Sequence, residues 1–445
     1  MSGERIARNA NKAFSSLKVL TNKQRSEALK QIHDSLKSQK ESILKANQLD
    51  LENAIKNHVS ESLIKRLDLS NPGKFDTMLE GILDVADLPD PLGKVTLAKK
   101  LDDELDLYRI TSPIGVLLII FESRPEVIAN ITALAIKSGN SAILKGGKES
   151  YQTFKIMSDI VNATLATKTD VPSDAVQLIQ SREDVSDLLD QDKYIDLVIP
   201  RGSNELVRSI KANTKIPVLG HADGICSIYV DSNFDIGKAK RIIVDSKTNY
   251  PAGCNAVEQL LINKHICLKD VEELLNALIE NKVTIHITPE LKKFLGNCNN
   301  NNNNNNIDEQ YVKETEADSF DKEYLSLDIS VGLVDDVQEA IDHINHHSSK
   351  HTECIITENE DVANRFLKSV DSAGVYWNAS TRFADGFRYG FGTEVGISTN
   401  KIHARGPVGL EGLTSYQYQL KGNGHVVGEY KGGGGNKSFL HKDII

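Results

Sequence analysis

The chain has 445 residues, of which 40% are hydrophobic and 26% are charged, so a disulfide-dependent miniprotein, a disordered chain and a fibrous protein are excluded. Aspartate and glutamate (62) outnumber lysine and arginine (52), and the net charge of -10 disfavours a nucleic acid partner. The longest apolar run, Ile114 to Phe121, is far shorter than the roughly 18 residues of a membrane span, so no membrane is expected.

The first seventy residues carry helical periodicity. Thr21 and Gln24 predict a capping box, and four apolar residues then recur at the spacing of one helix face: Ala28, Leu29, Ile32 and Leu36. Farther along, Pro125 stands at the favoured first position of a helix that Gly139 ends.

Beyond Pro113, short apolar runs of strand length alternate with helical patterns. The runs lie at 114–121, 141–144, 175–179, 194–200 and 225–230, then at 257–262, 327–334, 354–357 and 374–377. This alternation predicts an α/β fold with two domains, each with a mostly parallel sheet. The asparagine-rich segment 297–306 predicts a disordered insertion, and the glycine-rich segment 429–445 predicts a flexible tail.

The usual dinucleotide fingerprint, G-x-G-x-x-G, follows none of the early strands. Two other connections from strand to helix carry groups suited to a cofactor. Lys145 and Lys148 either meet ribose hydroxyls or an adenosine phosphate, or belong to a solvated loop. Gly202 and Ser203 stand at a predicted helix N-terminus, which either binds a pyrophosphate or is an ordinary cap.

Cys254 lies in the sequence Asn-Tyr-Pro-Ala-Gly-Cys-Asn, which leads into the second series of runs. Small residues before the sulfur leave room for a substrate carbonyl, and the Cys254 amide N–H can face the oxyanion of a tetrahedral adduct. These features favour a nucleophile. The alternative is a cysteine that only fills space, because cysteine is among the most often buried residues.

The cysteines and histidines carry two further expectations. Five cysteines without a C-x-x-C pair are typical of a reducing compartment, and the N-terminus lacks the apolar segment of a secretory signal, so we expect a cytoplasmic protein. Four histidines cluster at a polar helix end without acidic or thiolate ligands, so no metal is predicted: His343, His346, His347 and His351.

Several blocks, taken in chain order, resemble the gamma-glutamyl phosphate reductase family of the aldehyde dehydrogenase superfamily. They lie at 121–127, 144–149, 199–203, 249–255, 375–399 and 403–407. The resemblance implies an aldehyde dehydrogenase-like fold with a parallel-sheet cofactor domain, an α/β catalytic domain and a small oligomerisation flap. We expect an NADP-binding domain at 1–100 and 113–230, a catalytic domain at 231–412, and oligomerisation arms at 101–112 and 413–428.

The implied reaction is the NADPH-dependent reduction of L-glutamyl 5-phosphate to L-glutamate 5-semialdehyde and phosphate, the second step of proline biosynthesis from glutamate. A Cys254 thiolate can displace phosphate from this activated acyl group and form a thioester, which hydride then reduces. Hydrolytic aldehyde dehydrogenases carry a glutamate that activates water; here the comparable place holds His221. This difference favours a reductase.

The resemblance also implies roles for individual residues in cofactor binding. Lys145, Gly202 and Ser203 match the positions that hold the dinucleotide, and Glu323 matches a glutamate that contacts the nicotinamide ribose. Lys148 stands where many NAD-using relatives have a glutamate that would repel a 2′-phosphate, so NADPH is expected.

Further roles concern the substrate and the oxyanion. The superfamily's oxyanion asparagine is missing, so Ser123 is invoked in its place. Arg124, Asn255, Arg382 and Arg405 are candidate substrate ligands, with Arg124 favoured for the phosphate. Where the family commonly has a histidine after Cys226, this chain has Ser227.

The resemblance predicts a homo-oligomer and a substrate supplied by a separate glutamate 5-kinase. Two alternatives stay open. One is an NAD(P)-dependent aldehyde dehydrogenase that oxidises a small aldehyde to its acid. The other is a catalytically silent scaffold of the same fold.

Overall fold

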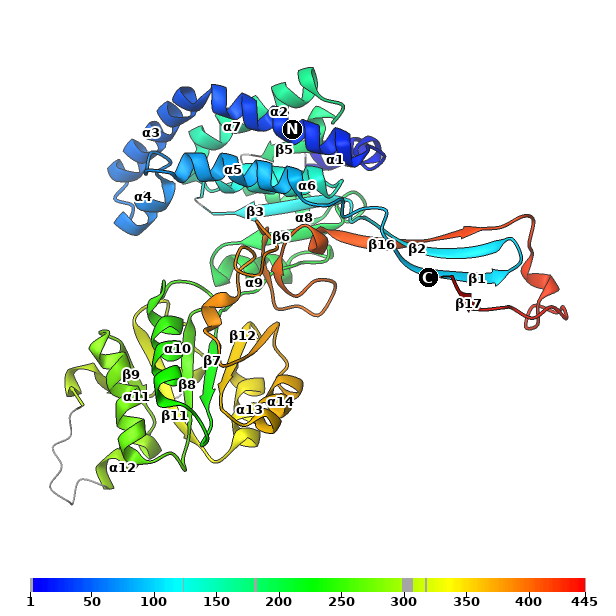
Figure 1. Cartoon of the computed structure of the whole chain (residues 1–445). Coiled ribbons are helices and arrows are strands. Elements are labelled where there is room, and N and C mark those ends of the chain that lie inside the picture. Colours follow the sequence, from blue (N-terminus) through cyan, green and yellow to red (C-terminus); the bar gives the residue numbers. More distant parts are fainter. Residues whose placement is uncertain (1–2, 123, 180–181, 298–306, 317, 445) are drawn as a thin grey trace. The chain divides into compact units, whose positions relative to one another are not determined.

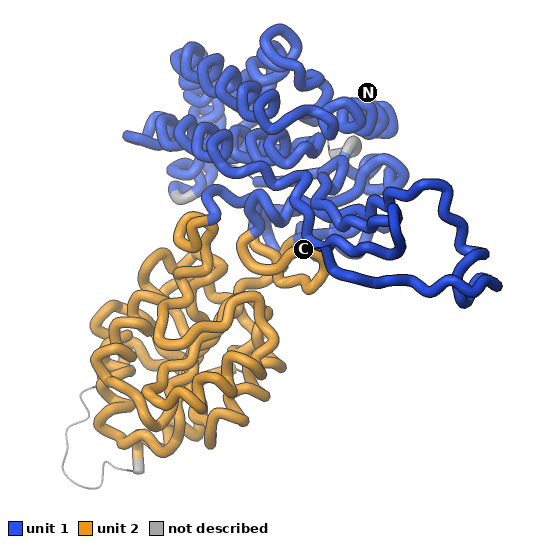
Figure 2. The backbone as a smooth tube through the Cα atoms, turned by 45° about the vertical axis from the view of Figure 1, so that its right-hand side comes forward, with its two compact units in different colours: residues 1–219, 391–396, 408–445 blue, residues 220–390, 397–407 orange. Residues whose placement is uncertain are grey.

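The computed structural model describes residues 3–122, 124–179, 182–297, 307–316 and 318–444. The chain divides into two compact units (Figure 2). Unit 1 comprises residues 1–219, 391–396 and 408–445, and unit 2 comprises residues 220–390 and 397–407. The sequence places the boundary after residue 230, whereas the structure places it after Leu219, because strand β7 (Cys226–Val230) pairs within the sheet of unit 2.

Unit 1 begins with helices, as the sequence predicts. They are α1 (Gly3–Leu17), α2 (Asn22–Ser38), α3 (Lys40–Lys56), α4 (Glu61–Leu67) and α5 (Lys74–Asp87). The predicted capping box is confirmed at the start of α2, where Thr21 N–H donates to Gln24 Oε1 at 2.9 Å and Gln24 N–H donates to Thr21 Oγ1 at 3.3 Å. The predicted apolar face of α2 is buried.

A four-stranded parallel sheet follows in unit 1, in the order β5-β4-β3-β6. Every residue of β3 is buried, which explains the uninterrupted apolar run. The strands are β3 (Val116–Phe121), β4 (Ser141–Lys145), β5 (Val176–Ile179) and β6 (Leu197–Arg201), and the helices are α6 (Val127–Lys137), α7 (Tyr151–Lys168), α8 (Arg182–Leu189) and α9 (Asn204–Ala212).

Unit 2 contains a seven-stranded parallel sheet in the order β10-β9-β11-β8-β7-β12-β13. Besides β7, its strands are β8 (Val257–Asn263), β9 (Thr284–Ile287), β10 (Val312–Glu314), β11 (Asp328–Val334), β12 (Thr352–Ile356) and β13 (Gly374–Trp377). Its helices are α10 (Ile236–Thr248), α11 (Leu268–Glu280), α12 (Pro289–Asn297), α13 (Val337–His347) and α14 (Glu360–Ser369). The parallel α/β architecture is confirmed, whereas strands β9 and β10 are not among the runs predicted.

The arm is an antiparallel sheet in the order β16-β2-β1-β17, which Figure 1 shows as a long ribbon. Its strands are β1 (Val95–Asp102), β2 (Leu105–Pro113), β16 (Thr414–Lys421) and β17 (Lys442–Asp443). The sequence predicts a flexible tail from residue 429, but the structure folds it against β1. Tyr430 is 2% exposed, and its hydroxyl donates to Asp102 Oδ2 at 2.7 Å.

Two short strands, β14 (Gly396–Ser398) and β15 (Gly406–Val408), form a separate pair. The predicted insertion at 297–306 falls, apart from Asn297, outside the described residues. Within the described part of the chain, the structure contains no helix with the length and apolar character to cross a bilayer.

Candidate active site

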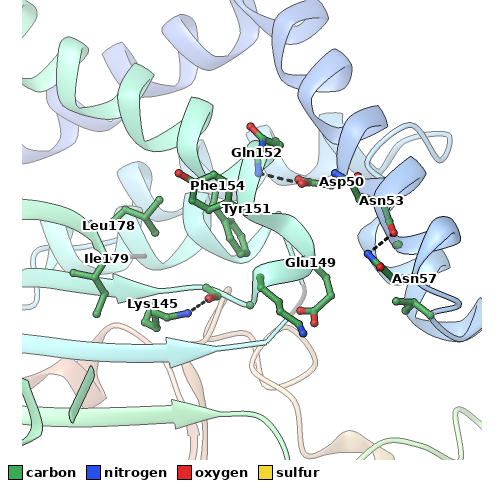
Figure 3. A pocket seen from close by; sticks show the side chains of 15 residues that line it. Asp50, Asn53, Asn57, Lys145, Glu149, Tyr151, Gln152, Phe154, Leu178 and Ile179 are labelled. Carbon is green, nitrogen blue, oxygen red and sulfur yellow. Dashed lines mark hydrogen bonds between the residues drawn. The ribbon is translucent and has the colours of Figure 1, made fainter. Parts of the chain in front are cut away.

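A pocket of about 590 Å³ opens in unit 1 where β4 meets α7 (Figure 3). Lys145 ends β4, and Lys148 begins the short 3-10 turn Lys148–Ser150 that precedes α7. Both predicted cofactor lysines line this pocket, together with Gly146, Glu149 and residues of α3 and β5. The Lys148 side chain is exposed.

Asp50 of α3 fixes one wall of this pocket. Its carboxylate accepts a hydrogen bond from the N–H of Gln152 at 3.0 Å (Figure 3). It also accepts from the N–H of Thr153 at 2.8 Å and from the Thr153 hydroxyl at 2.7 Å. Burial raises the pKa of Asp50, and these hydrogen bonds oppose that rise. A carboxylate at a helix N-terminus is favourable, so Asp50 joins α3 to α7 and orders the pocket.

Gly146 lets the chain approach Phe154 closely at the pocket floor. A Cβ at this position would lie 2.1 Å from Phe154 Cε2, so a side chain cannot be accommodated without movement of the ring. The pocket therefore combines two lysines with a glycine turn, an arrangement suited to a polyanionic ligand.

Gly202 and Ser203 connect β6 to α9, as the sequence predicts. The Ser203 hydroxyl accepts from Leu206 N–H at 3.5 Å and caps α9, while Ser203 N–H donates to Glu122 Oε1 at 3.3 Å. A Cβ on Gly202 would lie 2.8 Å from the Glu122 carboxyl group. The Glu122 carboxylate thus lies at the helix N-terminus, where a pyrophosphate is expected, and nothing in the sequence pattern had singled it out.

Ser123, the predicted oxyanion donor, lies outside the described residues. Arg124 belongs to unit 1, and its side chain is exposed. Its carbonyl accepts from Val127 N–H at 3.1 Å and starts the turn before α6.

Cys254 lies in unit 2, in a tight turn between α10 and β8. Gly253 N–H donates to the Tyr250 carbonyl at 3.0 Å, and Ala256 N–H donates to the Gly253 carbonyl at 2.9 Å. The turn leaves the Cys254 side chain partly exposed, whereas Cys226 is fully buried. Burial raises the pKa of Cys226 well above its usual value.

The backbone of Gly224 lies directly against this turn. A Cβ at Gly224 would lie 2.3 Å from the Cys254 carbonyl oxygen and 2.5 Å from its Cα. The backbone N–H of Gly224 also donates to the Glu323 carboxylate. This predicted cofactor ligand is half-buried, and burial raises the pKa of its carboxyl group. Its bond to Gly224 places it beside the Cys254 turn.

Arg382 lies beside the turn, because a Cβ at Gly253 would come within 2.7 Å of the Arg382 Nη1. It is 9% exposed, and its Cζ lies 5.8 Å from the centre of the Tyr250 ring. Burial and the neighbouring Arg388 lower the pKa of Arg382, while Cys254 opposes that shift. The Arg382 Nε is buried without a hydrogen-bond partner in the described part of the chain.

Two other predicted substrate ligands have structural partners. Asn255 Nδ2 donates to the Ala384 carbonyl at 2.8 Å, and the Asn255 carbonyl accepts from Thr381 Oγ1 at 2.7 Å. Arg405 pairs with Asp371 at 3.1 Å, where Lys350 and Lys401 also bind. Together the three cations lower the pKa of Asp371.

The structure separates the four clustered histidines. His343 and His347 lie on α13 with ring centres 4.5 Å apart, and burial with the charge of His347 lowers the pKa of His343 to about 4. His351 instead lies beside His221, with ring centres 5.0 Å apart and an angle of 81° between the rings. His221 Nδ1 lies 2.9 Å from the Ile397 carbonyl oxygen.

A buried polar network lies along the sheet behind the turn. Lys247 pairs with Glu258 at 2.6 Å, and both side chains are fully buried. Ser227 N–H donates to the Glu353 carboxylate, and the Ser227 hydroxyl donates to Gln259 Oε1 at 3.1 Å. Burial raises the pKa of Glu353 to about 7. Ser227 is therefore a buried residue whose hydrogen bonds lie within the sheet of unit 2.

The chain was compared with known proteins. The model of the aldehyde dehydrogenase family matches residues 2–324. A curated gamma-glutamyl phosphate reductase of Saccharomyces cerevisiae is 60% identical over 100% of this chain and 98% of its own length. A probable gamma-glutamyl phosphate reductase of Schizosaccharomyces pombe is 51% identical over the same shares. The crystal structure of gamma-glutamyl phosphate reductase from Thermotoga maritima has a TM-score of 0.89 at 36% identity and covers 96% of this chain and 100% of that chain.

Replacement of Gly224 by alanine should disturb the Cys254 turn. The added methyl group would overlap backbone atoms of Cys254, so we expect a loss of about 1–3 kcal/mol in the free energy of unfolding. We also expect a changed rate of Cys254 alkylation by iodoacetamide. Urea unfolding and mass spectrometry of the labelled cysteine measure the two effects.

The matched control is Gly296→Ala. No described atom lies within 4 Å of a Cβ at Gly296, and this helical position should gain up to about 1 kcal/mol. Equal effects of the two substitutions on stability and alkylation would contradict the contact between Gly224 and Cys254.

Proposed function

The chain belongs to the aldehyde dehydrogenase family and, within it, to the gamma-glutamyl phosphate reductases, and we propose that it reduces L-glutamyl 5-phosphate to L-glutamate 5-semialdehyde and phosphate with NADPH. The reaction would be the second step of proline biosynthesis from glutamate. The observation that carries the proposal is the partly exposed Cys254, in a glycine-bordered turn close to the buried Arg382 guanidinium.

Cys254 is the proposed nucleophile. Its sulfur attacks the acyl carbon of the glutamyl phosphate, a thioester forms, and inorganic phosphate leaves. The thioester carbonyl would then be reduced by hydride, which is the chemistry that a nicotinamide cofactor would supply when bound. The resulting thiohemiacetal collapses, the carbon–sulfur bond breaks, and the aldehyde leaves as the thiolate is regenerated. An acyl phosphate is already activated, so no water takes part.

Arg382 is the proposed anion ligand closest to this chemistry. Its buried guanidinium interacts electrostatically with Cys254, and guanidinium groups bind phosphate and carboxylate oxygens. The unpartnered Nε leaves a donor for substrate. Arg405 is already paired with Asp371, so we assign it a smaller part. Arg124 remains a proposed second ligand for the phosphate.

For the oxyanion we propose the amide N–H of Cys254, with Ser123 as a further donor. Asn255 is proposed to contact substrate through its side chain, whose buried Oδ1 lacks a partner within the described residues. Hydrolytic relatives need a carboxylate base that activates water. The comparable place here holds His221, which supports a reductase over an enzyme that forms the acid.

The family uses a nicotinamide cofactor, and the residues of the unit 1 pocket fit one. Lys145 and Lys148 offer ammonium donors, and the chain at Gly146 packs so closely on the Phe154 ring that a Cβ would overlap it. We propose that these lysines hold the adenosine ribose and its 2′-phosphate, and that Gly202 and Ser203 bind the pyrophosphate. Glu323 is the proposed partner of the nicotinamide ribose.

We propose a cytoplasmic enzyme, a location supported by the four described cysteines, which are all free: Cys226, Cys254, Cys267 and Cys354. The acyl phosphate would come from a separate glutamate 5-kinase.

The arm is proposed to mediate homo-oligomerisation. Three large side chains alternate along one face of β16 and are 55%, 57% and 58% exposed: Tyr416, Tyr418 and Leu420. An exposed apolar row on an edge strand is typical of a surface that pairs with another chain.

Phosphate dependence tests the reaction. With glutamate semialdehyde and NADP⁺, we expect sustained NADPH formation only when inorganic phosphate is present, because in the reverse direction phosphate must attack the thioester and displace the Cys254 thiolate. Absorbance of NADPH measures the rate. Equal rates without phosphate would instead support the aldehyde-oxidising alternative.

Removal of the nucleophile tests the role of Cys254. Cys254→Ala should lower kcat by several orders of magnitude, since the thioester cannot form. Cys267→Ser is the matched control, because Cys267 is exposed and away from the turn. Full activity of the Cys254→Ala variant would indicate another nucleophile, whereas a wild-type protein without activity would favour the scaffold alternative.

Charge reversal at Lys148 tests the cofactor assignment. Lys148→Glu places a carboxylate in the pocket, where it repels a 2′-phosphate and accepts hydrogen bonds from the ribose hydroxyls. The ratio of kcat/KM for NADH to kcat/KM for NADPH should therefore rise by about tenfold or more. Lys215→Glu provides the same charge change at an exposed unit 1 residue that does not line the pocket. An unchanged ratio of the two kcat/KM values would refute the role of Lys148.

Lysines on the exposed face of β16 should weaken self-association. We expect the double variant Tyr416→Lys, Tyr418→Lys to show a lower mass than wild type in light scattering coupled to size exclusion. The control Gln417→Lys, Gln419→Lys changes the opposite face of the same strand. A wild-type mass for the tyrosine variant would rule out this face as the interface.

A further inference from the structure

Three side chains of unit 2 bring potential metal ligands together at one edge of the sheet. His221 precedes β7, Cys254 precedes β8, and His351 precedes β12, and these three strands are neighbours. One ligand atom from each side chain lies within 4.8 Å of the other two. Parallel strands begin at the same edge, which explains why residues so distant in sequence meet here.

The hydrogen bond of His221 prepares its ring for a metal. A carbonyl oxygen only accepts, so the contact of 2.9 Å with the Ile397 carbonyl requires a proton on Nδ1. In the neutral ring, Nε2 then carries the lone pair. Metal-binding histidines commonly hold the other ring nitrogen in this way.

His351 supplies an independent indication of a ligand. The side chain is 1% exposed, and its Nδ1 lies 2.8 Å from Thr352 Oγ1. Its Nε2 is buried without a hydrogen-bond partner in the described part of the chain. Buried ring nitrogens normally have a hydrogen-bond or metal partner, so the unpaired Nε2 indicates a position for a ligand.

We propose that His221, Cys254 and His351 form a Zn²⁺ site whose occupation reversibly blocks the catalytic thiol. Two imidazoles and a thiolate are favoured zinc ligands and leave a fourth position for water. Zinc bonds are about 2.0 Å long to nitrogen and about 2.3 Å long to sulfur, so the ligand atoms of a tetrahedral site lie about 3.5 Å apart. Side-chain rotations that move the ligand atoms by about 1 Å would bring the three side chains from their present separation to this one. Binding releases the thiol proton to solvent.

The blocking effect rests on the proposed function, because occupation of Cys254 stops turnover only if this sulfur is the nucleophile. A bound metal holds the sulfur lone pair that would attack the acyl carbon. The site is thus a means by which free zinc inhibits the enzyme without oxidation of the thiol.

Cobalt binding tests the site separately from catalysis. The full-length protein, treated with chelator and reductant, is titrated with Co²⁺. We expect one Co²⁺ per chain, a thiolate-to-cobalt charge-transfer band in the near ultraviolet, and loss of the band when Zn²⁺ displaces cobalt. Reductase activity should fall in parallel with zinc occupancy and return with chelator. Absence of the band, or full activity with zinc bound, would overturn the proposal.

Variants identify the ligands. Cys254→Ala should abolish the charge-transfer band, and His221→Asn and His351→Asn should each weaken cobalt affinity by at least about tenfold. Circular dichroism and thermal unfolding show whether each variant is folded, and the partly exposed His221 provides a test that does not depend on replacing the buried His351. His347→Ala is the matched control, because it removes a histidine of the separate cluster on α13.

The two possible failures give different results. A band that persists in both histidine variants, or that is lost in His347→Ala, would overturn the zinc site whatever the enzyme catalyses. Reductase activity that survives in Cys254→Ala would overturn the proposed function, while the cobalt band of the wild type would still report on the metal site.

Discussion

The contact between the backbones of Gly224 and Cys254 determines the geometry on which the rest of the site depends. Because residue 224 has no side chain, the segment before β7 lies against the turn before β8. The same segment carries His221 and donates the Gly224 N–H to Glu323. One missing Cβ therefore brings a thiol, an imidazole and a carboxylate into a single region of unit 2.

The buried charges behind the turn illustrate a second constraint. Burial lowers the pKa of Lys247 and raises that of Glu258, and each group offsets the desolvation of the other. Loss of either partner would leave an uncompensated charge in the sheet interior, which is far more costly than the pair itself. Leu325 N–H donates to Glu258 at 3.3 Å, so the pair also anchors the segment that carries Glu323.

Much of the fold was predictable because its causes are local. A continuous apolar run identified β3, whose residues are all buried, and the spacing of Thr21 and Gln24 identified the start of α2. Strand β9 escaped prediction because it is short and alternates half-buried with buried residues. The boundary after Leu219 and the folded tail depend on pairing with distant strands, which local pattern does not encode.

In the candidate site too, residues in local sequence patterns were predictable and residues that depend on distant contacts were not. Cys254 and the lysines at residues 145 and 148 stand at strand ends, where chemistry is expected, and the structure places them in a turn and a pocket. Asp50 was missed because its partner Gln152 is 102 residues away. Glu122 and the pairing of Arg405 with Asp371 likewise depend on tertiary contacts.

Strand β17 has a consequence for aggregation. A sheet with two bare edges can add strands at both sides and grow into a filament. Here β17 pairs with Lys99 and Lys100, and Leu440 and Ile444 donate to neighbouring carbonyls of β1. In the described residues β17 is itself the outer strand on this side, and a strand of two residues offers little backbone to another chain, so growth of this ribbon is favoured beside β16.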